Sequence, residues 1–104
     1  MRRLVYLAAA RGDLLDILVS VTEISGSVAT GRRYVDGIRA QCRKLAALPG
    51  LIGRPRPELR PDIRSAAHRS YVIYFRYVGE TFELVSILHA RRDVTSVFRS
   101  REGG

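Results

Sequence analysis

Apolar and polar residues repeat with a helical period in the first half of the chain and with a strand period in the second. In the first half, the leading apolar stripe consists of Leu14, Ile17, Leu18, Val21 and Ile24. This spacing predicts an amphipathic helix. A short strand over Arg3–Leu7 is expected before the helix, and Ser25-Gly26-Ser27 should end it.

A second helix is expected from there to about Leu48, because Pro49-Gly50 stops the pattern. Its inward face should carry Tyr34, Ile38, Cys42, Leu45 and Leu48. The two helices therefore predict a helical hairpin. Residues 49–62 hold all four prolines of the chain, and since proline removes a backbone donor, this segment should be neither helix nor central strand. Leu51, Ile52 and Leu59 could fix it to the domain.

Three strands should follow, over Ile63–His68, Tyr71–Val78 and Thr81–Ala90, with Gly79-Glu80 as a tight turn. If Val78 faces Thr81, the continuous register places four residues on the face covered by the helices: Ile73, Phe75, Leu84 and Leu88. They should lie beneath Leu14, Leu18, Ile38 and Leu45.

The opposite face of this hairpin should pair Arg76 with Glu83. Beyond the last strand, Asp93 could cap a short helix that holds Val94, Val97 and Phe98. The order β-α-α-β-β-β with a C-terminal helix predicts an α+β fold, in which a helical hairpin packs on a small antiparallel sheet. At 104 residues, we expect a single domain over residues 1–104.

The formal net charge of +8 favours an acidic partner. The lone Cys42 cannot form an internal disulfide, which fits a cytoplasmic protein. The apolar stretch Leu4–Ala10 is too short for a membrane span, so no membrane partner is expected. Direct binding of nucleic acid is not expected either, because Tyr71, Tyr74 and Tyr77 alternate across both faces of a strand.

Most catalytic chemistries lack their residues in this chain. There is no glycine-rich phosphate loop, no Gly-x-Ser-x-Gly elbow, and no carboxylate pair near His68 or His89. Hence we expect no metal and no cofactor. Metal-free RNA cleavage remains open, because it needs only acid, base and arginine groups. Its candidate residues are Arg64, Arg69, Arg76, Arg91, Arg92 and His89. Glu83 should neutralise Arg76, however, and a histidine that ends a strand more often packs than catalyses.

The second half of the chain resembles the ParE branch of the RelE/ParE toxin superfamily. Four segments carry the resemblance, in the order and spacing of that family: Gly53–Pro61, Arg64-Ser65, Tyr71–Arg76 and Leu88–Asp93. The matched motif residues are Arg64, Tyr71, Arg76, His89, Arg92 and Asp93.

The resemblance implies a RelE/ParE-like fold and the toxin of a type II toxin–antitoxin pair. Such a toxin binds the GyrA polypeptide of DNA gyrase, blocks replication and is neutralised by an acidic antitoxin in a hetero-oligomer. It is expected not to be an enzyme. The alternative is a RelE-like, ribosome-dependent mRNA endoribonuclease that would use Arg64, Arg76, His89 and Arg92. Phe98 occupies the position of that branch's usual tyrosine and has no hydroxyl group.

A second stripe on the first helix is the candidate antitoxin surface. Leu15, Val19 and Thr22 lie away from the main stripe, and similar toxins often carry acidic residues at the first two positions. We expect apolar residues of the antitoxin's C-terminal segment to cover Leu15 and Val19. Its acidic groups should meet Arg32, Arg33 and Arg39 of the next helix. Alternatively, the second helix itself covers Leu15 and Val19.

Overall fold

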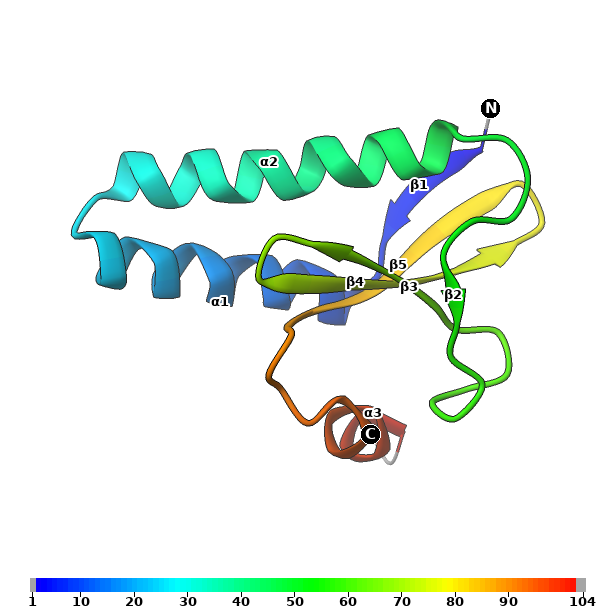
Figure 1. Ribbon diagram of the computed structural model, residues 1–104. Coiled ribbons are helices and arrows are strands. Elements are labelled where there is room, and N and C mark those ends of the chain that lie inside the picture. The colour runs from blue at the N-terminus through cyan, green and yellow to red at the C-terminus, as the bar shows by residue number, and fades with distance from the viewer. Residues whose placement is uncertain (1, 103–104) are drawn as a thin grey trace.

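The computed structural model describes residues 2–102 as an α+β fold with one sheet and three helices (Figure 1). The strands are β1 (Arg3–Tyr6), β2 (Arg54–Pro55), β3 (Arg64–His68), β4 (Tyr71–Val78) and β5 (Thr81–His89). The helices are α1 (Ala8–Ser25), α2 (Val28–Ala47) and α3 (Val94–Glu102). The expected fold class is confirmed. The segment with four prolines contributes only the two-residue edge strand β2.

The sheet is mixed, with the strand order β1-β5-β4-β3-β2. β1 runs parallel to β5, with Arg3 beside Thr81 and Tyr6 beside Leu84. The other pairs are antiparallel, as expected. The parallel pair arises because the chain leaves β1 through the helical hairpin and three further strands before β5 returns beside it.

The helical hairpin turns where the sequence predicts it. Gly26 caps α1 in the left-handed conformation with φ 72°, and its N–H donates to the Thr22 carbonyl at 2.8 Å. Glycine adopts this conformation without a Cβ penalty. Ser27 then caps α2, because its hydroxyl accepts a hydrogen bond from the Thr30 N–H at 3.2 Å. Together the caps end one helix and start the next within three residues.

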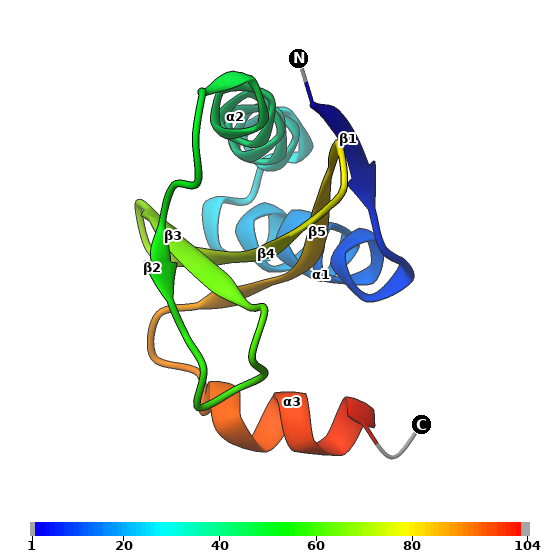
Figure 2. The same cartoon turned by 90° about the vertical axis from the view of Figure 1, so that its right-hand side faces the viewer.

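The hairpin covers one face of the sheet (Figures 1 and 2) and forms the main core. Phe75 is fully buried there and stacks on Phe82 with ring centroids 4.5 Å apart. Core residues named by the sequence pattern include Leu14, Ile17, Ile38, Cys42, Leu45, Ile73 and Leu84. Two inward assignments on the helices are wrong. Ile24 lies in the last turn of α1, where it is 86 % exposed, and Leu48 caps α2 at 42 % exposure.

A β-bulge divides the β4–β5 hairpin. The expected register holds from Val78 beside Thr81 to Phe75 beside Leu84, and then shifts by one residue. Consequently Ile73 faces Ile87, where the continuous register would place Ser86. A shift of one residue sends side chains to the opposite face. The prediction that Leu88 packs beneath the helical hairpin is therefore wrong.

Leu88 belongs to a second core on the other face of the sheet, which α3 covers (Figure 2). Tyr74 and Phe98 are buried there, and their rings meet edge to face at a centroid distance of 5.5 Å. Leu59, Ile63 and Val85 complete this second core. Asp93 caps α3 as predicted, by accepting from the Ser96 N–H at 3.2 Å. Helices therefore cover both faces of the sheet.

Cys42 is a core residue of α2 with no exposed surface. Burial raises the pKa of its thiol to about 11. Burial, together with the neighbouring Cys42, also raises the pKa of the Tyr6 hydroxyl to about 12. Both groups are therefore neutral at physiological pH and contribute packing to the core.

Candidate functional site

Two of the motif arginines hold the structure together. The Arg64 guanidinium donates from Nε to the Ile52 carbonyl at 2.7 Å and from Nη2 to the Gly53 carbonyl at 3.2 Å. These bonds tie the proline-containing loop to β3. Although Ile52 and Leu59 pack inward as suggested, Leu51 is 64 % exposed.

Arg76 pairs with Glu83 across the β4–β5 hairpin, as predicted. Its Nε lies 2.7 Å from Glu83 Oε1, and its Nη1 lies 3.7 Å from Asp62 Oδ2. Two carboxylates therefore balance this guanidinium, which reduces its ability to stabilise the negative charge of a reacting phosphate.

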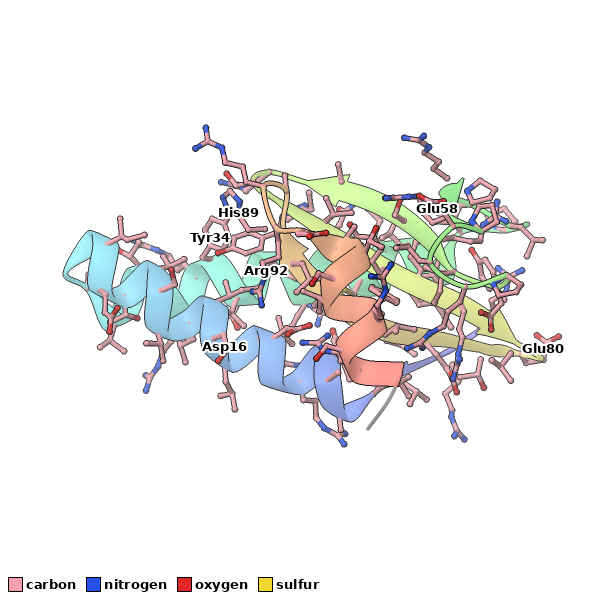
Figure 3. The ribbon with its side chains drawn as sticks, turned by 90° about the horizontal axis from the view of Figure 1, so that it is seen from below. Asp16, Tyr34, Glu58, Glu80, His89 and Arg92 are labelled. Atoms are coloured by element: carbon pink, nitrogen blue, oxygen red, sulfur yellow. The ribbon has the colours of Figure 1, made fainter. Side chains whose placement is uncertain are left out.

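His89 and Arg92 lie at the other end of the sheet, beside α1. With Asp16, Ser20 and Tyr71 they line a hollow of about 300 Å³. Figure 3 shows Asp16, His89 and Arg92 together at this end of the molecule. The His89 imidazole accepts the Arg91 N–H at Nδ1 (3.1 Å), and its ring meets the Tyr71 ring at a centroid distance of 5.3 Å. His89 thus fixes the turn after β5 and packs on Tyr71.

The four residues of the ribonuclease alternative are not brought together. His89 pairs with Tyr71, whereas Glu83 pairs with Arg76. Tyr71 and Arg76 are five positions apart on β4, or roughly 17 Å at the rise of an extended strand. An acid, a base and a charge-stabilising arginine must all reach one phosphate. The two ends of this sheet do not offer that arrangement.

The sequence pattern missed Asp13, a buried residue of α1 that holds a hydrogen-bonded network. Its Oδ2 accepts from the Ser86 hydroxyl at 2.7 Å and from the Ile87 N–H at 2.9 Å. The guanidinium of Arg101 on α3 lies 2.9 Å from Oδ1. β1 pairs with β5 only as far as Leu84. Beyond that point the Asp13 carboxylate accepts the Ile87 N–H of β5, and it also joins α1 to β5 and α3. The available signal was Ser86, the one polar residue within the apolar run Leu84–Leu88 of β5.

Leu15 and Val19 stand out on the surface of α1, at 64 % and 54 % exposure. The alternative that α2 covers them is wrong. Thr22, one turn further on, is turned toward α2, because a Cβ at Gly31 would collide with its Oγ1. Leu15 and Val19 share a helix face with Thr22. They therefore lie on the flank of α1 that borders α2.

The three predicted arginines of α2 divide between two flanks. Arg32 and Arg39 are seven positions apart and so share one face of the helix, where Arg39 lies over the Tyr6 ring at 5.1 Å. Arg33 lines a separate hollow with Tyr34 and Arg69. The sequence pattern placed all three on one antitoxin surface, because it does not show how α2 is rotated about its axis relative to the sheet.

Within residues 2–102, no three histidine, cysteine, aspartate or glutamate side chains are placed to hold a metal ion. Over the same part of the chain, no helix is both long and apolar enough to cross a membrane.

Comparisons with known proteins agree with the motif resemblance. The family model for "ParE toxin of type II toxin-antitoxin system, parDE" matches residues 4–94. The chain is 28 % identical over 96 residues to toxin ParE3 of Caulobacter vibrioides, covering 92 % of this chain and 94 % of that protein. It is 34 % identical over 68 residues to toxin ParE1 of Mycobacterium tuberculosis, covering 64 % and 68 %, respectively.

A solved structure described as "Chromosomal ParDE TA system from P. aeruginosa" has a similar fold, with a TM-score of 0.76 and 22 % identity. The similarity covers 86 % of this chain and 96 % of that chain.

Proposed function

The chain belongs to the ParE toxin family of type II toxin–antitoxin systems, and from this premise we propose that it blocks replication by binding the GyrA polypeptide of DNA gyrase. A cognate acidic antitoxin would neutralise it by forming a hetero-oligomer. The proposal treats the protein as a binding toxin without catalytic activity. The observation that carries it is the separation of Arg64 and Arg76 from His89 and Arg92 along the sheet.

The C-terminal helix gives further support to a binding toxin. Phe98 is only 3 % exposed and packs on Tyr74 in the second core. It has no hydroxyl, so it can neither donate nor accept a proton during RNA cleavage. The position where RelE-like chains usually have a tyrosine is therefore structural in this protein.

The purified protein should trap gyrase on cleaved DNA. In a reaction with gyrase and supercoiled plasmid, we expect linear, protein-bound DNA to accumulate as the protein is added. Translating ribosomes treated with the same preparation should retain intact mRNA. The substitutions His89→Gln and Arg76→Ala provide the control, because no cleavage should exist for them to remove. Codon-specific mRNA cuts that disappear in His89→Gln would instead establish the ribonuclease alternative.

For the antitoxin, we propose that its C-terminal segment covers Leu15 and Val19. Exposed apolar side chains of this size on a small domain usually mark an interface. Arg32 and Arg39 lie on the neighbouring helix, where acidic residues of the antitoxin would reduce the positive charge. The solvent-exposed stripe supports this placement. Arg33 lies on the opposite flank of α2, so the antitoxin would contact it only if its segment extended across that helix.

The double substitution Leu15→Glu/Val19→Glu should weaken binding of the cognate antitoxin by about tenfold or more, or at least ~1.4 kcal/mol. Both side chains are solvent-exposed, so the toxin should stay folded. Titration calorimetry with the antitoxin and circular dichroism of the toxin alone measure the two effects. The matched control is Ile24→Glu/Leu51→Glu, since these residues are 86 % and 64 % exposed elsewhere. Equal affinity of the folded Leu15/Val19 variant and wild type would place the interface on another surface.

A further inference from the structure

A second hollow lies on the other flank of α2, beside the turn that joins β3 to β4. It has a volume of about 330 Å³, and its lining consists of Thr30, Arg33, Tyr34, Gly37 and Arg69. Tyr34 also touches Tyr71 edge to face (5.8 Å), and Tyr71 touches His89. Figure 3 shows Tyr34 at the same end of the molecule as His89 and Arg92, while Glu58 and Glu80 lie at the far end.

The two arginines of this hollow are not neutralised. Arg33 Nη2 donates only to the Thr30 hydroxyl at 3.4 Å, and the Arg69 guanidinium lies 6.0 Å from the centroid of the Tyr34 ring. Within residues 2–102 neither arginine forms an ion pair, and no carboxylate lines the hollow. This contrasts with Arg64 and Arg76, whose guanidinium groups are engaged. Two unpaired guanidiniums facing one cavity form a site for an anion.

The backbone at Arg69 is a second, independent feature of this site. Arg69 has φ 55°, and it is the one non-glycine residue with positive φ in the described chain. Glycine would adopt this conformation freely, whereas a long side chain there is strained. Residues held in such conformations cluster at binding sites. The strained turn carries the arginine to the edge of the hollow, opposite Arg33.

We propose that this hollow binds a phosphate group of a nucleic acid backbone. Arginine pairs with phosphate through its planar fork, and a neighbouring tyrosine can donate a hydrogen bond to the same backbone. An acidic protein segment would offer carboxylates, but protein interfaces usually include an apolar centre. None of the large exposed hydrophobic residues (Leu15, Val19, Ile24, Val28, Leu48, Leu51 and Val78) lines this hollow.

The inference goes beyond the proposed toxin function, and it can be tested without gyrase. The tyrosines of β4, which alternate across both faces of the sheet, do not indicate nucleic acid binding, whereas this hollow combines α2 with Arg69 of the β3–β4 turn. Gly37 borders open space in this hollow, because a Cβ at this position would have no atom within 4 Å.

The test measures binding of the full chain to a short fluorescent duplex DNA by anisotropy over a range of salt concentrations. Arg33→Ala/Arg69→Gly should weaken binding about tenfold or more and reduce the salt slope by about 1, because the contact to one phosphate is lost. Arg69→Gly also relieves the strained backbone, so the variant should be at least as stable as wild type. The control Arg43→Ala/Arg99→Ala removes the same charge at exposed positions outside the hollow and should change affinity by less than about threefold.

Gly37→Glu provides a second variant, because it places a carboxylate in the hollow without a steric clash. It should abolish the same binding. Inorganic phosphate should compete with DNA on the wild type, and a single-stranded RNA measured in parallel identifies which nucleic acid binds more tightly.

Two results would overturn the proposal. One is an equal loss of affinity in the hollow variant and the charge-matched control, since binding would then depend only on net charge. The other is tighter binding of a polyglutamate peptide than of DNA at the same ionic strength, if this binding is lost in Arg33→Ala/Arg69→Gly. The hollow would then be a site for an acidic polypeptide.

Discussion

Phe75→Ala should lower the free energy of unfolding by about 3–5 kcal/mol, the range for truncating a buried aromatic side chain. Phe75 has no exposed surface, and its ring stacks on Phe82 and meets Tyr77 edge to face at 5.8 Å. Alanine would leave a cavity between the sheet and the helical hairpin, which packed neighbours cannot fill completely.

Urea denaturation followed by circular dichroism measures this effect. Val78→Ala is the matched control on the same strand, because Val78 is 47 % exposed, and it should change stability by less than about 0.5 kcal/mol. A loss near zero for Phe75→Ala would mean that this face of β4 is not buried.

The second large effect is expected from Asp13→Ala, which should cost about 2–3 kcal/mol. The substitution leaves the buried Ile87 N–H without its acceptor and removes one partner from Ser86 and Arg101. The contribution of Arg101 itself is smaller, because its side chain is 35 % exposed and water can replace the carboxylate.

The network predicts how Asp13→Ala and Arg101→Ala combine. Since Arg101 joins α3 to Asp13, the double variant should be more stable than the sum of the two losses predicts. Amide exchange in α3 should become faster in either single variant. Asp16→Ala, on the exposed face of the same helix, serves as the control. Additive losses, with exchange in α3 unchanged, would show that Asp13 does not hold that helix.

Local patterns were sufficient for most of the secondary structure. Ser25-Gly26-Ser27 supplies both helix caps, and Gly79-Glu80 sets the β4–β5 turn. The register failed at Val85, because residues 85–88 are apolar on both faces of the sheet except for Ser86. Without an alternating pattern, nothing in the strand marks a one-residue shift. The parallel pairing of β1 is equally invisible, since it joins residues from opposite ends of the chain.

The functional residues divide in the same way. The Arg76–Glu83 pair followed from strand register alone, and the separate stripe of Leu15 and Val19 followed from helical spacing, although its exposure is seen only in the structure. The partners of Asp13 come from three separate elements, so no local pattern contains them. The hollow between Arg33 and Arg69 likewise depends on how α2 lies against the β3–β4 turn.

The pairing of β1 with β5 also affects the order in which the protein can fold. Residue 3 lies beside residue 81, and closing a loop of that length costs about 4 kcal/mol of chain entropy apart from a constant. The helical hairpin involves only local contacts and can form much earlier. During synthesis, a ribosome-bound chain would therefore carry formed helices whose apolar face has no completed sheet to cover it. The interval before β5 emerges is when this protein is most exposed to chaperones, proteases and aggregation.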